Sequence, residues 1–305
     1  MSQTWLVYGS KGWIGEKFVS AASSLPSVIP LCGKARCDNF ADLKAEILSL
    51  RPDRVISLIG RTSGPAPSGE TEEVIRRTDT STIDWLEAPG HLRYNLRDNL
   101  YAPLLMERVC SDLGIHFTYM GTGCIFVGEE IPFTEDAEPT FYGSAYSTVK
   151  GFTDRLMHFS PHTLNVRIRM PIVREKCVKN FLTKILSYEK INSSLNSMTV
   201  LEDMIPILCD LVLQGFTGTY HLVNPGPMTH AEILDLYKEI VDPNFTYRLM
   251  GEDELRLTLK AERSRCVLDT TAIEKMYHPP TLKESLVRIF SASREGQSSA
   301  PSGCN

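Results

Sequence analysis

A glycine-rich turn near the N-terminus constrains the fold more than any other feature of the sequence. Three glycines form a Gly-x-x-Gly-x-x-Gly pattern over residues 9–15, directly after the apolar segment Trp5–Tyr8 and directly before a segment with helical spacing. Such glycines permit a tight turn, a close approach of backbone to a pyrophosphate, and close helix–strand packing. The helix N-terminus then points free N–H groups at the phosphates. The predicted cofactor contacts at this turn are Gly9, Gly12, Trp13, Ile14 and Gly15.

The first half of the chain alternates strand-like and helix-like segments. This alternation implies βαβ units and a parallel sheet that is covered on both faces. We therefore expect an α/β fold: a Rossmann-type doubly wound parallel sheet that binds NADP over residues 1–170, with Ile59 and Gly60 contacting the cofactor after the third strand. The expected strands are Trp5–Tyr8, Val28–Leu31, Arg54–Ile59, His116–Met120 and Leu164–Ile168, and the expected helices are Trp13–Ser23, Phe40–Leu50, Asn95–Leu113 and Tyr146–Phe159.

The pattern changes in the second half. Beyond Pro171 the alternation loosens, which predicts a smaller substrate-binding lobe over residues 171–290 that exchanges segments with the first domain. The stretch 291–305 has few apolar residues and is expected to be a disordered tail. Residues 62–70, rich in Pro, Gly and Ser, are expected to form a surface loop.

The residues after the second predicted strand bear on the choice of cofactor. An NAD site would place an acidic side chain there to hold the ribose hydroxyls. Arg36 is instead suited to pair with a 2′-phosphate, assisted by Lys11, which favours NADPH. Asp38 would serve NADH if the strand ended later, so NADH remains the alternative.

Composition excludes several classes of function. A net charge of −5 and a pI near 5.9 argue against a nucleic-acid-binding protein. The start of the chain does not resemble a secretory signal, and no apolar run is long enough to span a membrane. The eight cysteines lack Cys-x-x-Cys pairs and the histidines lack ligand spacing, so we expect no metal site and a cytoplasmic location.

A Tyr-x-x-x-Lys pair lies in the last predicted helix of the first half. The spacing places Tyr146 and Lys150 on one helical face. A nearby ammonium group favours the phenolate, which suits the tyrosine to exchange a proton with a carbonyl oxygen. Thr122 follows the fourth predicted strand, where a hydroxyl could hydrogen-bond the same carbonyl. Without Thr122, the pair would more simply be a helical surface pair.

The glycine turn, Thr122, Tyr146 and Lys150 together resemble the extended short-chain dehydrogenase/reductase superfamily. Further blocks are similar, in the same order, to the bifunctional 3,5-epimerase/4-reductases that complete nucleotide-activated L-rhamnose. The similarity covers about residues 4 to 288, although the segment around residues 62–80 is longer than expected. The blocks are GTGCIF, GSAYSTVKGFTDRLM, RIRMPI, NFLTKILSYEKI, NSMTVLEDMIPI, NPGPMTHAEIL and RSRCVLD.

The resemblance implies an enzyme that inverts carbons 3 and 5 of a nucleoside-diphosphate 4-keto-6-deoxy-D-glucose and reduces carbon 4 with NADPH. The family assigns the inversion to a cysteine and a lysine, which match Cys124 and Lys184. Both side chains can exchange protons near neutral pH in a suitable environment. Without the resemblance, Cys124 would be a small buried residue and Lys184 a solvated helix charge.

Four more residues are candidates by the same resemblance. Asn99 matches a structural asparagine near the catalytic lysine, and Gly123 lies between two substrate-contacting residues. Asn180 is expected to orient the substrate diphosphate, and Arg263 to pair with it through two hydrogen bonds. Each of Asn99, Asn180 and Arg263 could instead be an ordinary surface residue.

Two other functions remain open from the sequence. In a 4-keto reductase without epimerase activity, Cys124 and Lys184 would be remnants without a catalytic role. A non-catalytic regulatory subunit, similar to that of methionine adenosyltransferase, would not need Thr122, Tyr146 and Lys150. A 4,6-dehydratase is disfavoured because no carboxylic acid follows Thr122. The sequence leaves UDP or dTDP undecided, and a homodimer is expected only by analogy with the superfamily.

Overall fold

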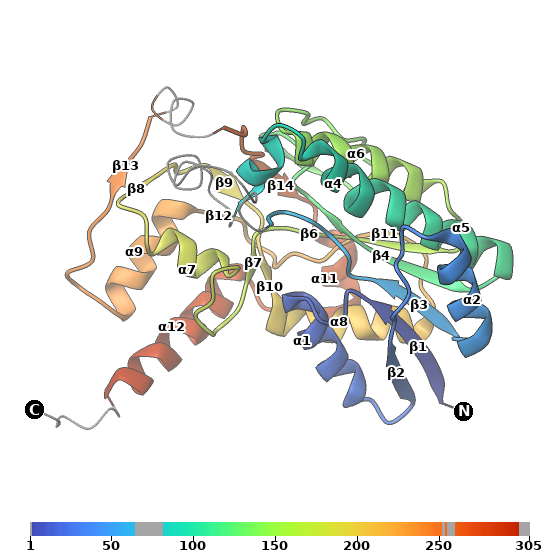
Figure 1. Cartoon of the computed structure of the whole chain (residues 1–305). Helices are drawn as coiled ribbons and strands as arrows, with labels where there is room; N and C mark the ends of the chain where they lie inside the picture. The colour runs from blue at the N-terminus through green and yellow to red at the C-terminus, as the bar shows by residue number, and fades with distance from the viewer. Residues whose placement is uncertain (1, 65–81, 252–253, 255–259, 299–305) are drawn as a thin grey trace, which may run out of the picture.

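Six parallel strands form the central sheet of the protein, whose computed structural model describes residues 2–64, 82–251, 254 and 260–298 (Figure 1). The strand order is β11-β6-β4-β3-β1-β2. The chain passes from β1 to β2 on one side and returns to β3 on the other, so the carboxyl ends of β1 and β3 flank a crevice where ligands bind in such sheets. The strands are β1 (Gln3–Tyr8), β2 (Val28–Cys32), β3 (Arg54–Ser57), β4 (His116–Thr122), β6 (Thr163–Ile168) and β11 (Gly218–His221).

Helices cover both faces of this sheet, as the sequence predicts. Alternate residues of a strand point to opposite faces. Trp5 and Val7 therefore pack in a core with residues of α1 and α8, whereas Leu6 and Tyr8 pack with residues of α2 and α5. Figure 1 shows α4, α5 and α6 above the sheet and α1 and α8 below it. The helices are α1 (Trp13–Ser23), α2 (Phe40–Leu50), α4 (Leu92–Leu96), α5 (Ala102–Leu113), α6 (Ala145–His158) and α8 (Leu201–Gln214).

The helix expected at Asn95–Leu113 is continuous but irregular. Between α4 and α5 it contains a π-helical turn, η2 (Arg97–Tyr101). Pro103 has no N–H, so it cannot donate to the carbonyl of Asn99 four residues earlier. That carbonyl instead accepts a hydrogen bond of 2.6 Å from Thr153 Oγ1 on α6. The irregular turn thereby fastens the α4–α5 segment to α6, and π-helical turns often mark functional sites.

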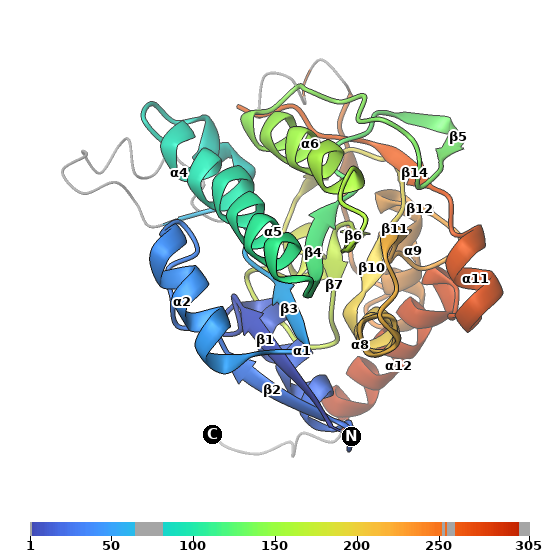
Figure 2. The same cartoon turned by 90° about the vertical axis from the view of Figure 1, so that its right-hand side faces the viewer.

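The second half of the chain builds a smaller lobe with its own core (Figure 1, left). Its segments do not all stay in that lobe, because β11 joins the central sheet and α8 packs beside α1 against it. Figure 2 shows the sheet between α4, α5 and α6 on one side and α8 on the other. The further elements are η1 (Ile83–Glu87), β5 (Gly128–Phe133), β7 (Pro171–Ile172), α7 (Phe181–Ile185), β8 (Lys190–Ile191), β9 (Leu195–Asn196), β10 (Thr199–Val200), β12 (Met228–Thr229), α9 (His230–Ile240), β13 (Arg248–Leu249), β14 (Cys266–Leu268), α11 (Thr271–Tyr277) and α12 (Leu282–Ser298).

Three predictions need correction or lie beyond the described residues. The tail expected to be disordered from residue 291 is helical as far as Ser298, because α12 continues from its packed turns around Leu286 and Phe290. The third strand ends at Ser57 rather than at residue 59. Most of the surface loop expected at 62–70 lies outside the described residues. None of the described helices is long and apolar enough to cross a membrane.

The hydrogen bond between Thr153 and Asn99 can be tested with an isosteric change. The Thr153 hydroxyl lies 2.6 Å from the Asn99 carbonyl oxygen and 2.9 Å from that of Val149 in its own helix. Thr153→Val removes this donor and leaves the Asn99 carbonyl without it, which is expected to lower the free energy of unfolding by about 1–3 kcal/mol. Thr118→Val is the matched control, because Thr118 is fully buried and its hydroxyl has no hydrogen-bond partner among the described residues. Urea unfolding should show a loss for Thr153→Val alone. Equal midpoints for the two variants would contradict this account of the π-helical turn.

Candidate active site

The glycine turn between β1 and α1 is shaped for close approach of a ligand. Gly9 has φ +81°, and a Cβ on Gly15 would lie 2.1 Å from the Gly9 carbonyl oxygen, so neither position accepts a side chain. Gly12 is the N-cap of α1, and no described side chain caps this helix. Its first N–H groups, which include those of Trp13 and Ile14, therefore face the crevice without a side-chain acceptor. The turn fits the pyrophosphate of a dinucleotide.

A single carboxylate organises the loop after β2. Glu46 on α2 accepts hydrogen bonds of 2.8 Å from the Tyr8 hydroxyl and from the backbone N–H groups of Lys34 and Ala35. These hydrogen bonds keep the pKa of Glu46 below its usual range, although burial opposes them. The loop is thus fixed immediately before Arg36, the residue expected to recognise a 2′-phosphate.

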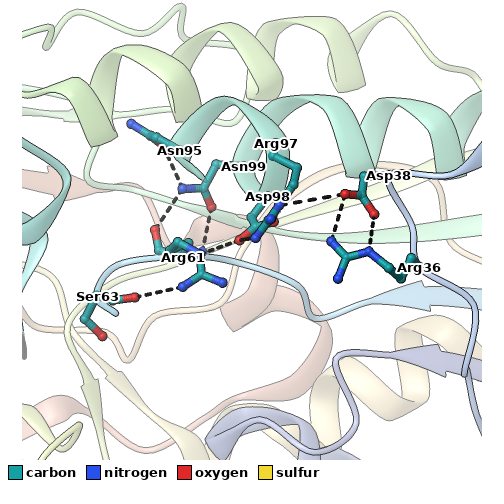
Figure 3. Close-up of polar contacts among 8 residues, drawn as sticks. All are labelled: Arg36, Asp38, Arg61, Ser63, Asn95, Arg97, Asp98 and Asn99. Carbon is teal, nitrogen blue, oxygen red and sulfur yellow. Dashed lines mark hydrogen bonds and ion pairs between the residues drawn. The ribbon is translucent and has the colours of Figure 1, made fainter. Parts of the chain in front are cut away.

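Arg36 is part of a chain of alternating charges (Figure 3). Its guanidinium group makes two hydrogen bonds to Asp38, of 2.9 and 2.8 Å, and its side chain is 67% exposed. Asp38 also lies 3.9 Å from Arg97, which pairs with Asp98 at 2.6 Å, and Asp98 pairs with Arg61. The carboxylate that would hold ribose hydroxyls is therefore engaged by two arginines, and the hydrogen bonds from Arg36 lower its pKa. The local charge favours an anion.

Asn99 fixes the segment that follows β3. Its side-chain oxygen accepts a hydrogen bond from the N–H of Arg61, and its amide donates to the Arg61 carbonyl, both at 2.8 Å. This reciprocal pair holds the backbone next to Ile59 and Gly60, the expected cofactor contacts. Because the carbonyl of Asn99 is bonded to Thr153 on α6, the same residue links the predicted cofactor crevice to the catalytic helix. It is buried, and is not an exposed amide.

The predicted reacting residues meet where β4 ends against α6. Thr122 and Tyr146 are both buried, and the Thr122 hydroxyl is near enough to the phenol to lower its pKa slightly. Cys124 packs beside Tyr146 and donates its backbone N–H to Thr122 Oγ1 at 3.1 Å. Burial raises the pKa of Tyr146, and the neighbouring Cys124 adds to the rise. The phenol therefore carries its proton at neutral pH in the protein without ligand.

Lys150 lies one turn along α6 from Tyr146 and is almost fully buried. Burial lowers its pKa to about 7, so the amine exists in both protonation states near neutral pH. Its amine donates to the Tyr119 hydroxyl and, at 3.2 Å, to the Met120 carbonyl. Tyr119, on β4 and fully buried, was not predicted from the sequence because it reads as an ordinary strand aromatic.

The two candidates Asn180 and Lys184 are carried by the short helix α7. Asn180 is buried and caps the helix by accepting from Leu182 N at 3.1 Å. Its amide group donates to the carbonyls of Val173 (2.8 Å) and Glu175 (2.9 Å). In this conformation its side chain organises the loop before α7. Lys184 is partly buried at the end of the same helix.

Arg263, the candidate for binding the diphosphate, is held by an acidic partner. It forms an ion pair of 2.5 Å with Asp84 and also donates to the Ala261 carbonyl at 2.7 Å. Asp84 is buried, and its pairing with Arg263 opposes burial and keeps its pKa low. The side chain of Arg263 is still 30% exposed, so one face remains accessible to an anion.

Arg169 was not predicted as a site residue, although the pattern of residues around it offered a clue. Arg167 and Arg169 alternate with apolar residues around the end of β6, and both are 1% exposed. Arginines at alternate positions of a buried strand share a face and need an unusual reason to be there. Arg167 forms a buried ion pair with Asp154 at 2.7 Å. Arg169 donates to Cys124 Sγ at 3.4 Å.

The sequence and the fold were compared with those of known proteins. No protein-family profile matches the sequence. A protein of Acanthamoeba polyphaga mimivirus is 44% identical over 280 residues, which are 90% of this chain and 92% of that protein. The crystal structure of a UDP-rhamnose synthase from the same virus superposes with a TM-score of 0.88 at 41% identity, over 95% of this chain and 99% of that one.

A plant relative extends the similarity. The bifunctional dTDP-4-dehydrorhamnose 3,5-epimerase/dTDP-4-dehydrorhamnose reductase of Arabidopsis thaliana is 30% identical over 297 residues, which are 94% of this chain and 92% of that protein. The dTDP-4-dehydrorhamnose reductase of Bacillus anthracis, solved with NADP, superposes with a TM-score of 0.74 at 14% identity. That last similarity demonstrates a common fold.

Proposed function

Because the chain belongs to the family of bifunctional nucleotide-4-keto-6-deoxyglucose 3,5-epimerase/4-reductases within the extended short-chain dehydrogenase/reductases, we propose that it converts UDP-4-keto-6-deoxy-D-glucose to UDP-L-rhamnose. One observation carries the proposal: Cys124, the epimerase candidate, packs against the cluster that contains Tyr146, the reductase candidate, and is near enough to raise the pKa of that tyrosine. One sugar ring could therefore meet both groups. The uridine nucleotide is proposed because the mimivirus enzyme is a UDP-rhamnose synthase.

The first reaction needs only proton transfers. The ketone at carbon 4 acidifies the protons on carbons 3 and 5, and the negative charge formed on loss of a proton resides on the ketone oxygen. We propose that Thr122 and Tyr146 donate hydrogen bonds to that oxygen. A base on one ring face removes the proton and an acid on the other face returns one, roles proposed for Cys124 and Lys184. No proton is gained or lost in sum.

The second reaction reduces the ketone. When bound, NADPH supplies the hydride that is added to carbon 4. Tyr146 then gives its proton to the ketone oxygen, which its raised pKa allows because the phenol stays protonated at neutral pH. Lys150, with a pKa of about 7, can return a proton to Tyr146. The fully buried Tyr119 keeps the lysine amine next to β4.

We propose NADPH as the preferred cofactor, with NADH as the weaker alternative. The backbone N–H groups at the start of α1 would bind the pyrophosphate, and Arg36 would bind the 2′-phosphate in place of Asp38. Lys11 could assist. Ile59 and Gly60 would line the crevice, and Tyr146 and Lys150 would lie at its nicotinamide end. Asn99 would act indirectly through the backbone of Arg61.

Further proposals follow from the same family membership. Residues 1–170 would bind the cofactor and residues 171–290 mainly the substrate, with Gly123 beside the sugar and Arg263 and Asn180 near the diphosphate. A cytoplasmic location and a homodimer complete the proposal. A 4-keto reductase without epimerase activity is the alternative, and the place of Cys124 between the cluster that contains Tyr146 and the guanidinium group of Arg169 argues against it.

Two substrates separate the two activities. Wild-type protein is expected to oxidise NADPH with UDP-4-keto-6-deoxy-D-glucose and with UDP-4-keto-L-rhamnose, which is already inverted. Cys124→Ser is expected to lower the rate on the first by at least about 100-fold, because general acid–base catalysis contributes on this order. Its rate on the second should stay within about threefold. Equal activity of the two proteins on both substrates would eliminate Cys124 as an epimerase residue.

The cofactor proposal has its own test. Arg36→Ala is expected to weaken NADPH binding by about 10–100-fold, since a charge-assisted hydrogen bond contributes about 1.5–3 kcal/mol, and to leave NADH binding unchanged. Arg108→Ala is the control, because Arg108 is another exposed arginine paired with an aspartate, Asp112. Titration of cofactor fluorescence measures both affinities. A parallel loss for NADPH and NADH would show that Arg36 does not recognise the 2′-phosphate.

A further inference from the structure

Arg169 is a buried cation without a buried anion. Its side chain is 1% exposed, yet it forms no ion pair with any carboxylate of the described residues. Its guanidinium group donates instead to neutral acceptors: the Gly123 carbonyl (3.3 Å), the Ser264 hydroxyl (2.8 Å) and carbonyl (2.6 Å), and the side-chain oxygen of Asn196. The remaining described contact is with Cys124 Sγ at 3.4 Å.

The neighbouring Arg167 makes the contrast clear. It is equally buried and lies two residues earlier, but Asp154 neutralises it at 2.7 Å. Burying a charge without a counter-ion costs free energy that the fold must offset elsewhere. The one polar atom of Arg169 without a partner among the described residues is Nε. The fold therefore maintains a positive charge at Cys124, and this points to a use for it.

Other described groups around this charge do not form an ion pair with it. The nearest acidic group that acts on Cys266 is Glu129, which lies 3.9 Å from Arg265 and accepts from Leu195 N rather than from Arg169. Burial lowers the pKa of His230 to about 4, with Arg169 contributing to the decrease, so the imidazole is neutral at pH 7. Cys266 faces the same guanidinium group, and burial raises its pKa, which keeps it a neutral thiol. Tyr146 is also neutral, and Lys150 is cationic or neutral near pH 7. None of these groups supplies a negative charge to Arg169.

We propose that Arg169 is a positioning residue that stabilises the thiolate of Cys124 during epimerisation, an inference that rests on the proposed epimerase function. When Cys124 acts as the acid, its S–H bond breaks as the new C–H bond forms on the sugar ring, and the sulfur is left negative beside the guanidinium group. The proton removed from the opposite ring face is later returned to the sulfur through solvent. A nearby arginine favours the thiolate in just this way.

The hydrogen bonds that hold Arg169 explain how it stays in place. Ser264 precedes β14 and Asn196 ends β9, so two separate segments of the chain accept from the guanidinium group. Asn196 also donates to the Ser194 carbonyl at 3.0 Å, which fixes its side-chain oxygen toward the arginine. Replacing Asn196 with aspartate would add the missing carboxylate without opening a cavity, although it removes the hydrogen bond that the amide donates to the Ser194 carbonyl.

Two variants remove the positive charge by different means. Arg169→Gln deletes it, and Asn196→Asp neutralises it while preserving shape. The rate of Cys124 alkylation by iodoacetamide is measured by mass spectrometry on cofactor-free protein at pH 7. This rate is expected to fall about tenfold in both variants, since the thiolate is the reactive form and a nearby positive charge shifts an equilibrium between thiol and thiolate by about tenfold or more. Cys32, which is exposed, serves as the internal reference and should not change. At pH 10 the rates at Cys124 should converge with wild type.

Turnover completes the test. Both variants should exchange deuterium at carbons 3 and 5 about tenfold more slowly, and should still reduce UDP-4-keto-L-rhamnose within about threefold of wild type. An unchanged rate of Cys124 alkylation in folded Asn196→Asp overturns the proposal, even if Arg169→Gln fails to fold. Wild-type protein separates the two hypotheses: if it incorporates no deuterium at carbons 3 and 5, the epimerase function fails, whereas the alkylation rates still report on Arg169.

Discussion

The hydrogen bond from Thr153 to the carbonyl of Asn99 is the contact on which the geometry of the site depends. It exists because Pro103 has no N–H to offer that carbonyl, so the segment from α4 to α5 forms a π-helical turn and a side chain of α6 takes the free acceptor. The Asn99 side chain, in turn, fixes the backbone of Arg61 after β3. One residue thereby sets the spacing between the proposed cofactor crevice and the helix that carries Tyr146.

The two proposed reactions, reduction and epimerisation, make different demands on the buried groups of the site. Reduction needs a phenol that keeps its proton, and burial of Tyr146 raises its pKa accordingly. The proposed epimerisation needs a sulfur that can lose its proton, and Arg169 places a positive charge beside the Cys124 sulfur. The two groups are neighbours, so the protein separates their behaviour by local contacts rather than by distance. Lys150, with a pKa lowered to about 7, can serve as a proton reserve.

The sequence predicted the fold well because both of its signals are local. Strand and helix periodicity gave the parallel sheet, and the glycine turn gave its ligand edge; helix α2 was predicted to the residue. The predicted set Thr122, Cys124, Tyr146 and Lys150 is brought together, as the motifs imply. The disordered tail was wrong from 291 to 298, because a polar segment continued a helix that was already packed. Arg169 and Tyr119 were missed, since only tertiary contacts reveal a buried charge without a counter-ion or a hydroxyl that holds a lysine.

The central claim is that one site both inverts and reduces the sugar. Wild-type protein with NADPH and UDP-4-keto-6-deoxy-D-glucose in deuterated water tests it most directly, with the product analysed by NMR. The account predicts UDP-L-rhamnose with deuterium at carbons 3 and 5 and with hydrogen from the cofactor at carbon 4. A 6-deoxy sugar that retains the D configuration and carries no deuterium at carbons 3 and 5 would contradict it.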